Sequence, residues 1–221
     1  MKLHPDVKSQ ADDLTLDPSR PLMLVDADEV ILQFATCLEE FLHENDLYFD
    51  MASFALNGNI KRKADDQAIA AEEIGALIGQ FFLEKTEHQP AVPGAPEALA
   101  SLSTRAQIVI VTNVPIPQRG ARIKSLKKHA MDYPVVANMG LKGDIIRYLA
   151  DMVDAPVYFI DDLPHNLTSV AQAAEDVHRI HFIADDRLAK LLGPAEDSHH
   201  RADSWPEAHA YLDQHLSAQG F

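Results

Sequence analysis

Short apolar runs separated by stretches with helical spacing are the feature that most constrains the fold of this chain. Five runs have the length and composition of strands: Leu22–Ala27, Gln107–Asn113, Tyr133–Asn138, Val157–Asp162 and His178–Ala184. Three of them are nearly continuous in apolar residues, as expected for parallel strands that are covered on both faces. The stretches between them, such as RGARIKSLKKHA and GDIIRYLADMV, carry apolar residues three and four positions apart. This alternation predicts an α/β fold with a Rossmann-like, mainly parallel sheet.

One connection is much longer than the fold requires. About 80 residues separate the first predicted strand from the second, whereas an ordinary crossover unit needs roughly 30. Two stretches within it, TCLEEFLHENDLY and DQAIAAEEIGALIGQFFLEK, have the apolar spacing of helices. We therefore predict a small helical cap subdomain over residues 34–92, inserted into an α/β core formed by 21–33 and 93–221. Residues 1–20 are predicted to be a polar N-terminal arm, and the last 36 a loop and a closing helix around Trp205.

The amino-acid composition and net charge limit the kinds of molecule that this protein is expected to bind. The chain has 221 residues, 47% of them apolar, which is enough for a well-buried core. Nineteen basic residues against 34 acidic ones give a net charge of −15, which argues against nucleic acid or an anionic membrane as partner. Any anionic substrate must therefore be met by a local cation. The oligomeric state stays open.

Cysteine use and the N-terminal sequence bear on the compartment. Cys37 is the only cysteine, so no intramolecular disulfide can form, and a reducing cytosol fits. The first 20 residues lack the apolar core of a signal peptide, and no run approaches the length of a membrane span. We expect a soluble, cytoplasmic protein.

Polar residues follow the predicted strands at the ends where open α/β sheets bind ligands. They are Asp26 and Asp28 after the first strand, Thr112 and Asn113 at the end of the second, Lys142 after the third, and Asp161, Asp162 and Asn166 at and after the fourth. We predict that they meet at one edge of the sheet. There Asp26, Asp28 and Asp161 would surround a hard divalent cation, and Lys142 would offset part of the remaining negative charge.

These residue types suit a phosphorylated substrate. Mg²⁺ takes oxygen ligands and is usually held by one or two carboxylates together with waters and substrate phosphate. The hydroxyl of Thr112, the amide of Asn113 and the ammonium of Lys142 can all donate to phosphate oxygens. A carboxylate can also attack a phosphoryl group and form an aspartyl-phosphate. A structural alternative exists for Asp161 and Asp162, which could cap a helix entry, and both roles can hold together.

Four short motifs resemble, in order, those of the haloacid dehalogenase superfamily. They are DADEV, VIVTN, LKGD and FIDDLPHN, and the resemblance covers about residues 20–185. It implies that Asp26 is the nucleophile and a metal ligand, and that Asp28 is the general acid/base, with its backbone carbonyl on Mg²⁺. Phosphatases and mutases of the superfamily have a carboxylic acid two residues after the nucleophile, whereas its dehalogenating members do not. The resemblance thus favours the phosphatase-like branch.

The resemblance also assigns roles to the remaining motif residues. Thr112 and Lys142 resemble the phosphate-orienting residues of the second and third motifs. Asp161 resembles the acidic metal ligand of the fourth motif, with Asp162 and Asn166 supporting the site. The insertion resembles the helical cap that closes over the substrate. One departure is Glu29, since the family commonly has glycine there for a tight turn.

Together these features predict a Mg²⁺-dependent phosphohydrolase acting on a small phosphorylated metabolite through an aspartyl-phosphate. A phosphomutase shares the same core residues, and a non-catalytic or regulatory binding protein could keep the fold and the metal site. The basic run Lys61, Arg62 and Lys63 lies inside the predicted cap. It is a candidate contact for an anionic part of the substrate remote from the phosphate, or else a solvated face.

Overall fold

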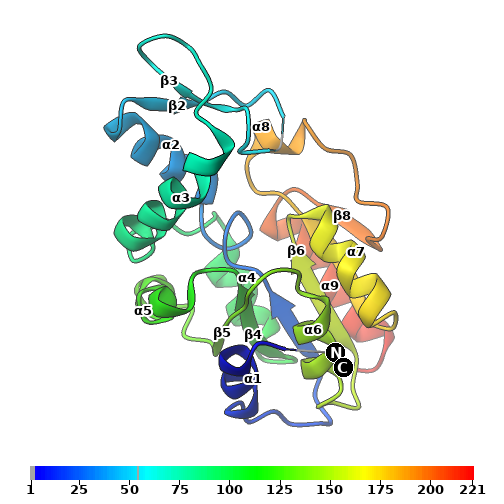
Figure 1. The fold of residues 1–221 in the computed structure, drawn as a ribbon. Coiled ribbons are helices and arrows are strands. Elements are labelled where there is room, and N and C mark those ends of the chain that lie inside the picture. The colour runs from blue at the N-terminus through cyan, green and yellow to red at the C-terminus, as the bar shows by residue number, and fades with distance from the viewer. Residues whose placement is uncertain (1–2, 54) are drawn as a thin grey trace.

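The computed structural model describes residues 3–53 and 55–221, and its centre is a parallel sheet (Figure 1). Among those residues the sheet has six strands in the order β5-β4-β1-β6-β7-β8. The strands are β1 (Leu22–Val25), β4 (Gln107–Thr112), β5 (Val135–Ala137), β6 (Val157–Asp161), β7 (His178–Phe182) and β8 (His200–Ala202). Every predicted strand is present, which confirms the α/β fold with a Rossmann-like sheet. The short edge strand β8 is an addition to the prediction.

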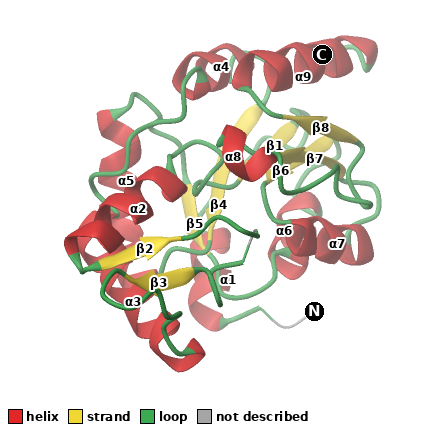
Figure 2. Ribbon diagram, turned by 90° about the horizontal axis from the view of Figure 1, so that it is seen from above, coloured by secondary structure: helices red, strands yellow, loops and turns green. Residues whose placement is uncertain are grey.

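Helices cover both faces of this sheet (Figure 2). On one face lie α4 (Ala95–Leu102) and α9 (Trp205–Ala218), and on the other lie α1 (Pro5–Asp12), α6 (Gly143–Ala150) and α7 (Pro164–Ala173). Side chains alternate between the two faces along β1. Met23 and Val25 pack with α4 and α9, while Leu22 and Leu24 pack with α1, α6 and α7. Burial on both faces explains why this strand is continuously apolar.

Helix α1 lies within the segment predicted to be a polar arm. His4 caps it by accepting a hydrogen bond from the Asp6 backbone N–H. Val7 and Ala11 are fully buried in the core against α6. The polar-arm prediction missed this helix because two apolar residues are too few to produce a periodic signal.

Residues 34–92 form a separate group of elements beside the sheet (Figure 1). The elements are α2 (Phe34–Glu44), β2 (Leu47–Phe49), β3 (Ile60–Arg62) and α3 (Ala71–Lys85). They share an apolar cluster that includes Leu38, Phe41, Ile60 and Phe81. Both helices lie where the apolar spacing placed them, whereas the antiparallel pair β2–β3 was not predicted. Three-residue strands carry too little alternation to be recognised.

Three short elements complete the described chain: the 3₁₀ turn η1 (Ile116–Gln118), α5 (Arg119–Lys128) beside β5, and α8 (Asp186–Ala189) between β7 and β8. Glu29 adopts a left-handed backbone conformation, with φ of 61°. Within the described residues, no helix combines the length and the apolarity needed to cross a bilayer.

Candidate active site

The sheet brings the first and fourth motifs together. Strand β1 lies between β4 and β6, so Asp26, directly after β1, is central at the carboxyl edge. Its backbone N–H donates to the carbonyl of Ile160 in β6 (2.9 Å). Asp161 is the last residue of β6, and Thr112 is the last of β4. Asp26, Thr112 and Asp161 therefore lie at neighbouring strand ends because of strand order.

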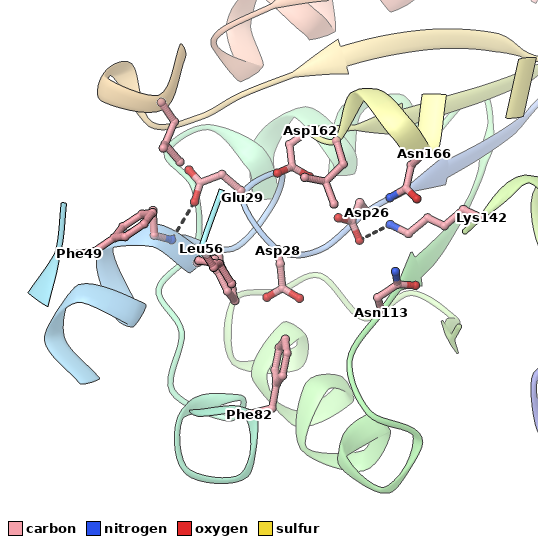
Figure 3. A pocket seen from close by; sticks show the side chains of 14 residues that line it. Asp26, Asp28, Glu29, Phe49, Leu56, Phe82, Asn113, Lys142, Asp162 and Asn166 are labelled. Atoms are coloured by element: carbon pink, nitrogen blue, oxygen red, sulfur yellow. Dashed lines mark hydrogen bonds and ion pairs between the residues drawn. The ribbon is translucent and has the colours of Figure 1, made fainter. Parts of the chain in front are cut away.

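Lys142 lies between two of the predicted carboxylates, Asp26 and Asp161; its ion pair with Asp26 is drawn in Figure 3. Its Nζ is 2.6 Å from Oδ1 of Asp26 and 2.7 Å from Oδ2 of Asp161, and all three side chains are buried. Carboxylate oxygens of Asp26, Asp161 and Asp162 lie within 4.8 Å of one another. One ammonium thus faces three buried carboxylates.

The excess of carboxylates over ammonium groups shifts the pKa values of Asp26, Asp162 and Lys142. Burial raises the pKa of Asp26 to about 7; Lys142 opposes the rise, and Asp161 and Asp28 add to it. Burial, followed by the charges of Asp161 and Asp26, holds the pKa of Asp162 well above its usual range. Burial alone would lower the pKa of Lys142, but Asp161 and Asp26 outweigh it and raise that pKa. Lys142 therefore stays charged, and the carboxylates need a further cation or a proton.

The donor set fits a hard divalent metal. All three clustered groups offer oxygen, the ligand that Mg²⁺ prefers. Asp161 is held rigidly, because it accepts hydrogen bonds from the Leu163 N–H (2.9 Å) and from Nδ2 of Asn166 (3.1 and 3.2 Å). Oδ1 of Asn166 is buried without a hydrogen-bond partner among the described residues. This orphaned acceptor at the cluster suits a metal-bound water.

The carboxylate of Asp28 lies outside this cluster, and Asp162 stands in it instead. Asp28 accepts two hydrogen bonds from Nη2 of Arg122 (2.7 and 2.8 Å) and one from Nε2 of Gln89 (2.9 Å). Arg122 also donates to Oε1 of Gln89, in the segment that leads back from α3 to the core. Sequence reasoning missed both partners. A signal existed, since Arg122 is three and four residues before Ser125 and Leu126 on the buried face of α5.

The two residues of the second motif have different surroundings. Thr112 is fully buried, and its Oγ1 is 3.5 Å from Oδ2 of Asp28. Asn113 lines the cavity beside Asp26, and its Nδ2 donates to the carbonyl of Gly140 (3.0 Å). Asn113 therefore lies at the cavity, while Thr112 contacts the Asp28 carboxylate.

Glu29 occupies the turn position where the resemblance implies glycine. A left-handed conformation costs a residue with a Cβ about 1–2 kcal/mol. Here the buried carboxylate compensates by accepting a hydrogen bond from the Ala35 N–H (2.8 Å) at the start of α2 (Figure 3). Burial raises the pKa of Glu29 to about 7. The turn is thus tied directly to the first helix of the inserted segment.

A cavity of about 250 Å³ opens beside Asp26, between the sheet edge and residues 34–92. At the sheet edge it is lined by polar residues already described, Asn113 and Lys142 among them. The opposite side is apolar and consists of Phe34, Ala35, Phe49, Leu56, Phe82 and Leu188. None of these apolar residues was named in the sequence-based prediction of the site.

The basic run of residues 61–63 does not reach this cavity. None of its three side chains is a lining residue, and each has a partner within residues 34–92. The partners of Lys61, Arg62 and Lys63 are, in that order, Asp50 (2.5 Å), Glu73 (3.3 Å) and the carbonyl of His43 (2.8 Å). These three side chains, which the sequence suggested as a substrate contact, therefore do not line the cavity.

Comparisons with known proteins identify the fold. No protein-family model matches the chain, and no curated protein matches it in sequence. Solved structures do match. A haloacid dehalogenase family hydrolase from Deinococcus radiodurans, with bound phosphate and sodium, has a TM-score of 0.58 at 14% identity, over 90% of this chain and 98% of that one. The chain has the haloacid dehalogenase fold.

Two further structures agree. CbbY from Rhodobacter sphaeroides, in complex with phosphate, has a TM-score of 0.56 at 15% identity over 84% of this chain and 95% of that one. A haloacid dehalogenase-like hydrolase from Streptococcus pneumoniae has a TM-score of 0.60 at 11% identity over 87% and 98%. These matches confirm the haloacid dehalogenase fold that the four motifs predicted.

Proposed function

We propose that the protein is a Mg²⁺-dependent phosphohydrolase that acts on a small phosphorylated metabolite through an aspartyl-phosphate. The observation that carries this proposal is the buried Asp26–Lys142–Asp161 arrangement, of which Asp26 and Lys142 line a cavity. Such a concave site with perturbed titratable groups is the usual location of catalysis. The Deinococcus and Rhodobacter structures, both solved with phosphate, support phosphate as the ligand.

Asp26, Asp161 and Asp162 would hold the metal, together with the backbone carbonyl of Asp28. When bound, a divalent cation neutralises the clustered carboxylates and polarises the phosphoryl oxygens. Lys142 remains charged beside it and holds Asp26 by the ion pair at 2.6 Å. The same ammonium and the amide of Asn113 are the donors available to phosphate oxygens at this edge.

Asp26 is the proposed nucleophile. One of its carboxylate oxygens bonds to phosphorus while the bond from phosphorus to the leaving alcohol oxygen breaks. Water then attacks the phosphorus of the aspartyl-phosphate, which releases inorganic phosphate and restores the Asp26 carboxylate. Burial raises the pKa of Asp26 to about 7 although Lys142 opposes the rise, so a bound cation would further favour the ionised carboxylate that the attack requires.

Asp28 is the proposed general acid, which gives a proton to the leaving alcohol, and then the base for the attacking water. Arg122 and Gln89 act as positioning residues, because their hydrogen bonds fix the carboxylate at the cavity. Residues 34–92 are proposed to serve as the cap over this site, since, together with Leu188 of α8, their side chains form the apolar side of the cavity.

A screen of phosphoric monoesters with Mg²⁺, run beside Asp26→Asn, tests the proposal. Wild-type protein should release phosphate from at least one ester, and Asp26→Asn should lose more than about 10³-fold in kcat. Equal hydrolysis by the wild type and Asp26→Asn would contradict the assignment of Asp26.

A further inference from the structure

The charged groups that line the cavity have one sign, with one exception. Four lining residues are acidic, Asp26, Asp28, Glu29 and Asp162, and among the described lining residues Lys142 is the cation. Lys142 is already engaged by Asp26 and Asp161. A substrate phosphate would therefore pair with Lys142, the one positive side chain in the described part of the cavity lining. A second anionic group on the substrate would then be buried without a cationic partner, which is strongly unfavourable.

The part of the cavity away from Asp26 is apolar. Phe49 ends β2, Leu56 follows in the connecting loop, and Phe82 lies on α3. Figure 3 shows these three side chains around the space on the side of Asp28 and Glu29, away from Lys142 and Asn166. The ring of Phe82 also packs against that of Phe34, with centroids 6.1 Å apart. The cavity thus has a polar end for a phosphoryl group and a largely apolar end. The two carboxylates that border the apolar end are already engaged, Glu29 by the Ala35 N–H and Asp28 by Arg122, so a charged group of either sign would lack a free partner there among the residues that the structure describes.

Other cations near the site are committed elsewhere. The guanidinium of Arg122 is fully buried and paired with Asp28. Arg187, on α8, is paired with both Glu39 and Asp185. The three basic residues of β3 and the turn after it are paired outside the cavity, as described above. Among the described residues, the apolar end has no cation within its own lining.

We propose that the substrate is a phosphoric monoester of a small, uncharged, apolar alcohol, whose alkyl or aryl group lies against Phe49, Leu56 and Phe82. This inference rests on the proposed function. The reaction is hydrolysis: water and the ester give the free alcohol and inorganic phosphate. A cavity of about 250 Å³ is at the small end of ligand pockets, which run from about 300 to 1,000 Å³, so one ring beside the phosphate is a fitting size.

The proposed class differs from the ligand of one structural neighbour. A variant of Rhodobacter CbbY, with a TM-score of 0.55 and 14% identity, was solved with xylulose-1,5-bisphosphate. That ligand carries a second phosphate. The lining of the present cavity offers no second cation to receive one.

A matched set of benzyl phosphates tests the inference. Benzyl, 4-carboxybenzyl and 4-(aminomethyl)benzyl phosphate share the leaving-group type and differ in the charge at the far end. We expect kcat/KM for benzyl phosphate to exceed that for each charged analogue at least tenfold. In a series from ethyl to n-butyl phosphate, kcat/KM should rise up to about fourfold for each added methylene.

The variant Leu56→Lys places an ammonium at the apolar end. It should shift the ratio of kcat/KM for benzyl over 4-carboxybenzyl phosphate at least tenfold toward the carboxylate. Because both substrates are measured on the same preparation, a loss of folded protein cannot produce this shift. Lys61→Gln, outside the cavity, is the matched control and should leave the ratio unchanged.

A wild-type preference for 4-carboxybenzyl, 4-(aminomethyl)benzyl or glycerol 3-phosphate would overturn the apolar assignment while leaving the phosphohydrolase standing. So would an unchanged ratio in Leu56→Lys, or hydrolysis of other monoesters but of no benzyl or alkyl ester. Absence of hydrolysis of every monoester in the screen would instead overturn the proposed function, and the inference with it.

Discussion

Lys142 is the residue on which the charge state of the site depends. Its side chain is 1% exposed and is ion-paired to both Asp26 and Asp161. The lysine sits at the N-cap of α6, and the glycine that follows it packs tightly against α7. Backbone packing and two ion pairs therefore hold the ammonium in one position, beside Asp26 and Asp161.

Replacing this lysine should therefore be costly. Lys142→Met leaves buried carboxylates without their protein cation, and breaking a buried pair costs about 3–5 kcal/mol. We expect a loss of that size in the free energy of unfolding at pH 7 without Mg²⁺, measured by denaturant titration. Lys190→Met, at an exposed lysine, is the control and should change stability little. Equal stability of the two variants would contradict the charge role of Lys142.

Glu29 allows a test of backbone strain. Its φ of 61° destabilises the folded state by about 1–2 kcal/mol for any residue with a Cβ. Glycine avoids this strain, but its greater conformational freedom in the unfolded chain lowers the free energy of unfolding by about 0.5–1 kcal/mol. Both Glu29→Ala and Glu29→Gly lose the hydrogen bond to the Ala35 N–H. Glu29→Gly should therefore be more stable than Glu29→Ala by about 0.5–1 kcal/mol in thermal unfolding. The opposite order would show that the turn is unstrained.

At the scale of elements, a helix or strand could be predicted from the sequence when many of its side chains are buried. Strands β1, β4 and β6 could be predicted because burial on both faces makes them continuously apolar. Helix α1 and the pair β2–β3 could not, because a few buried residues per element leave no period. The meeting of the carboxylates at the strand ends could be predicted from the topology of a parallel sheet. The contact of Arg122 with Asp28 could not, because it joins residues 94 positions apart and depends on how α5 packs.

Histidine rings from β7, from the residue before β8 and from α9 pack together around His178. The ring of His178 lies 4.4 Å from that of His199 and 4.2 Å from that of His215, and its Nε2 is 2.8 Å from the Tyr211 hydroxyl. Burial, with smaller effects of these histidines and Arg179, lowers the pKa of His178 from 6.5 to about 4. Between those values the unfolded chain binds more protons at this position than the folded one does.

Stability should therefore fall as the pH is lowered from about 6.5 toward 4. Thermal unfolding at a series of pH values checks this. His178→Gln should flatten the dependence between pH 6.5 and 5, while His165→Gln, at an exposed histidine, should not. An identical slope in the wild type and His178→Gln would contradict the assignment to His178.

For the whole molecule, the buried acidic cluster of Asp26, Asp161 and Asp162 is the feature that ties stability to a cation. The chain carries a net charge of −15, and its buried carboxylates meet at the edge of the central sheet, beneath residues 34–92. Metal binding there would stabilise the entire fold by mass action, because the unfolded chain does not assemble the three carboxylates.

Mg²⁺ should raise the melting temperature, with a stabilisation of about 2.7 kcal/mol at a concentration a hundredfold above Kd. Asp161→Asn should lose most of this shift, whereas Asp176→Asn, an exposed position, should keep it. Potassium chloride at matched ionic strength separates binding from screening of the net charge. An equal shift in both variants, or none in the wild type at millimolar Mg²⁺, would contradict the metal site.

We propose that Asp26 carries the phosphoryl group between the two half-reactions. Protein that is turning over the best ester of the screen in Mg²⁺ can be quenched rapidly in acid, digested, and analysed by peptide mass spectrometry. We predict one phosphoryl group on Asp26 in the wild type and none on this peptide in Asp26→Asn. Phosphate release with no modification of Asp26 at any quench time, or a phosphoryl group on another residue, would contradict the claim.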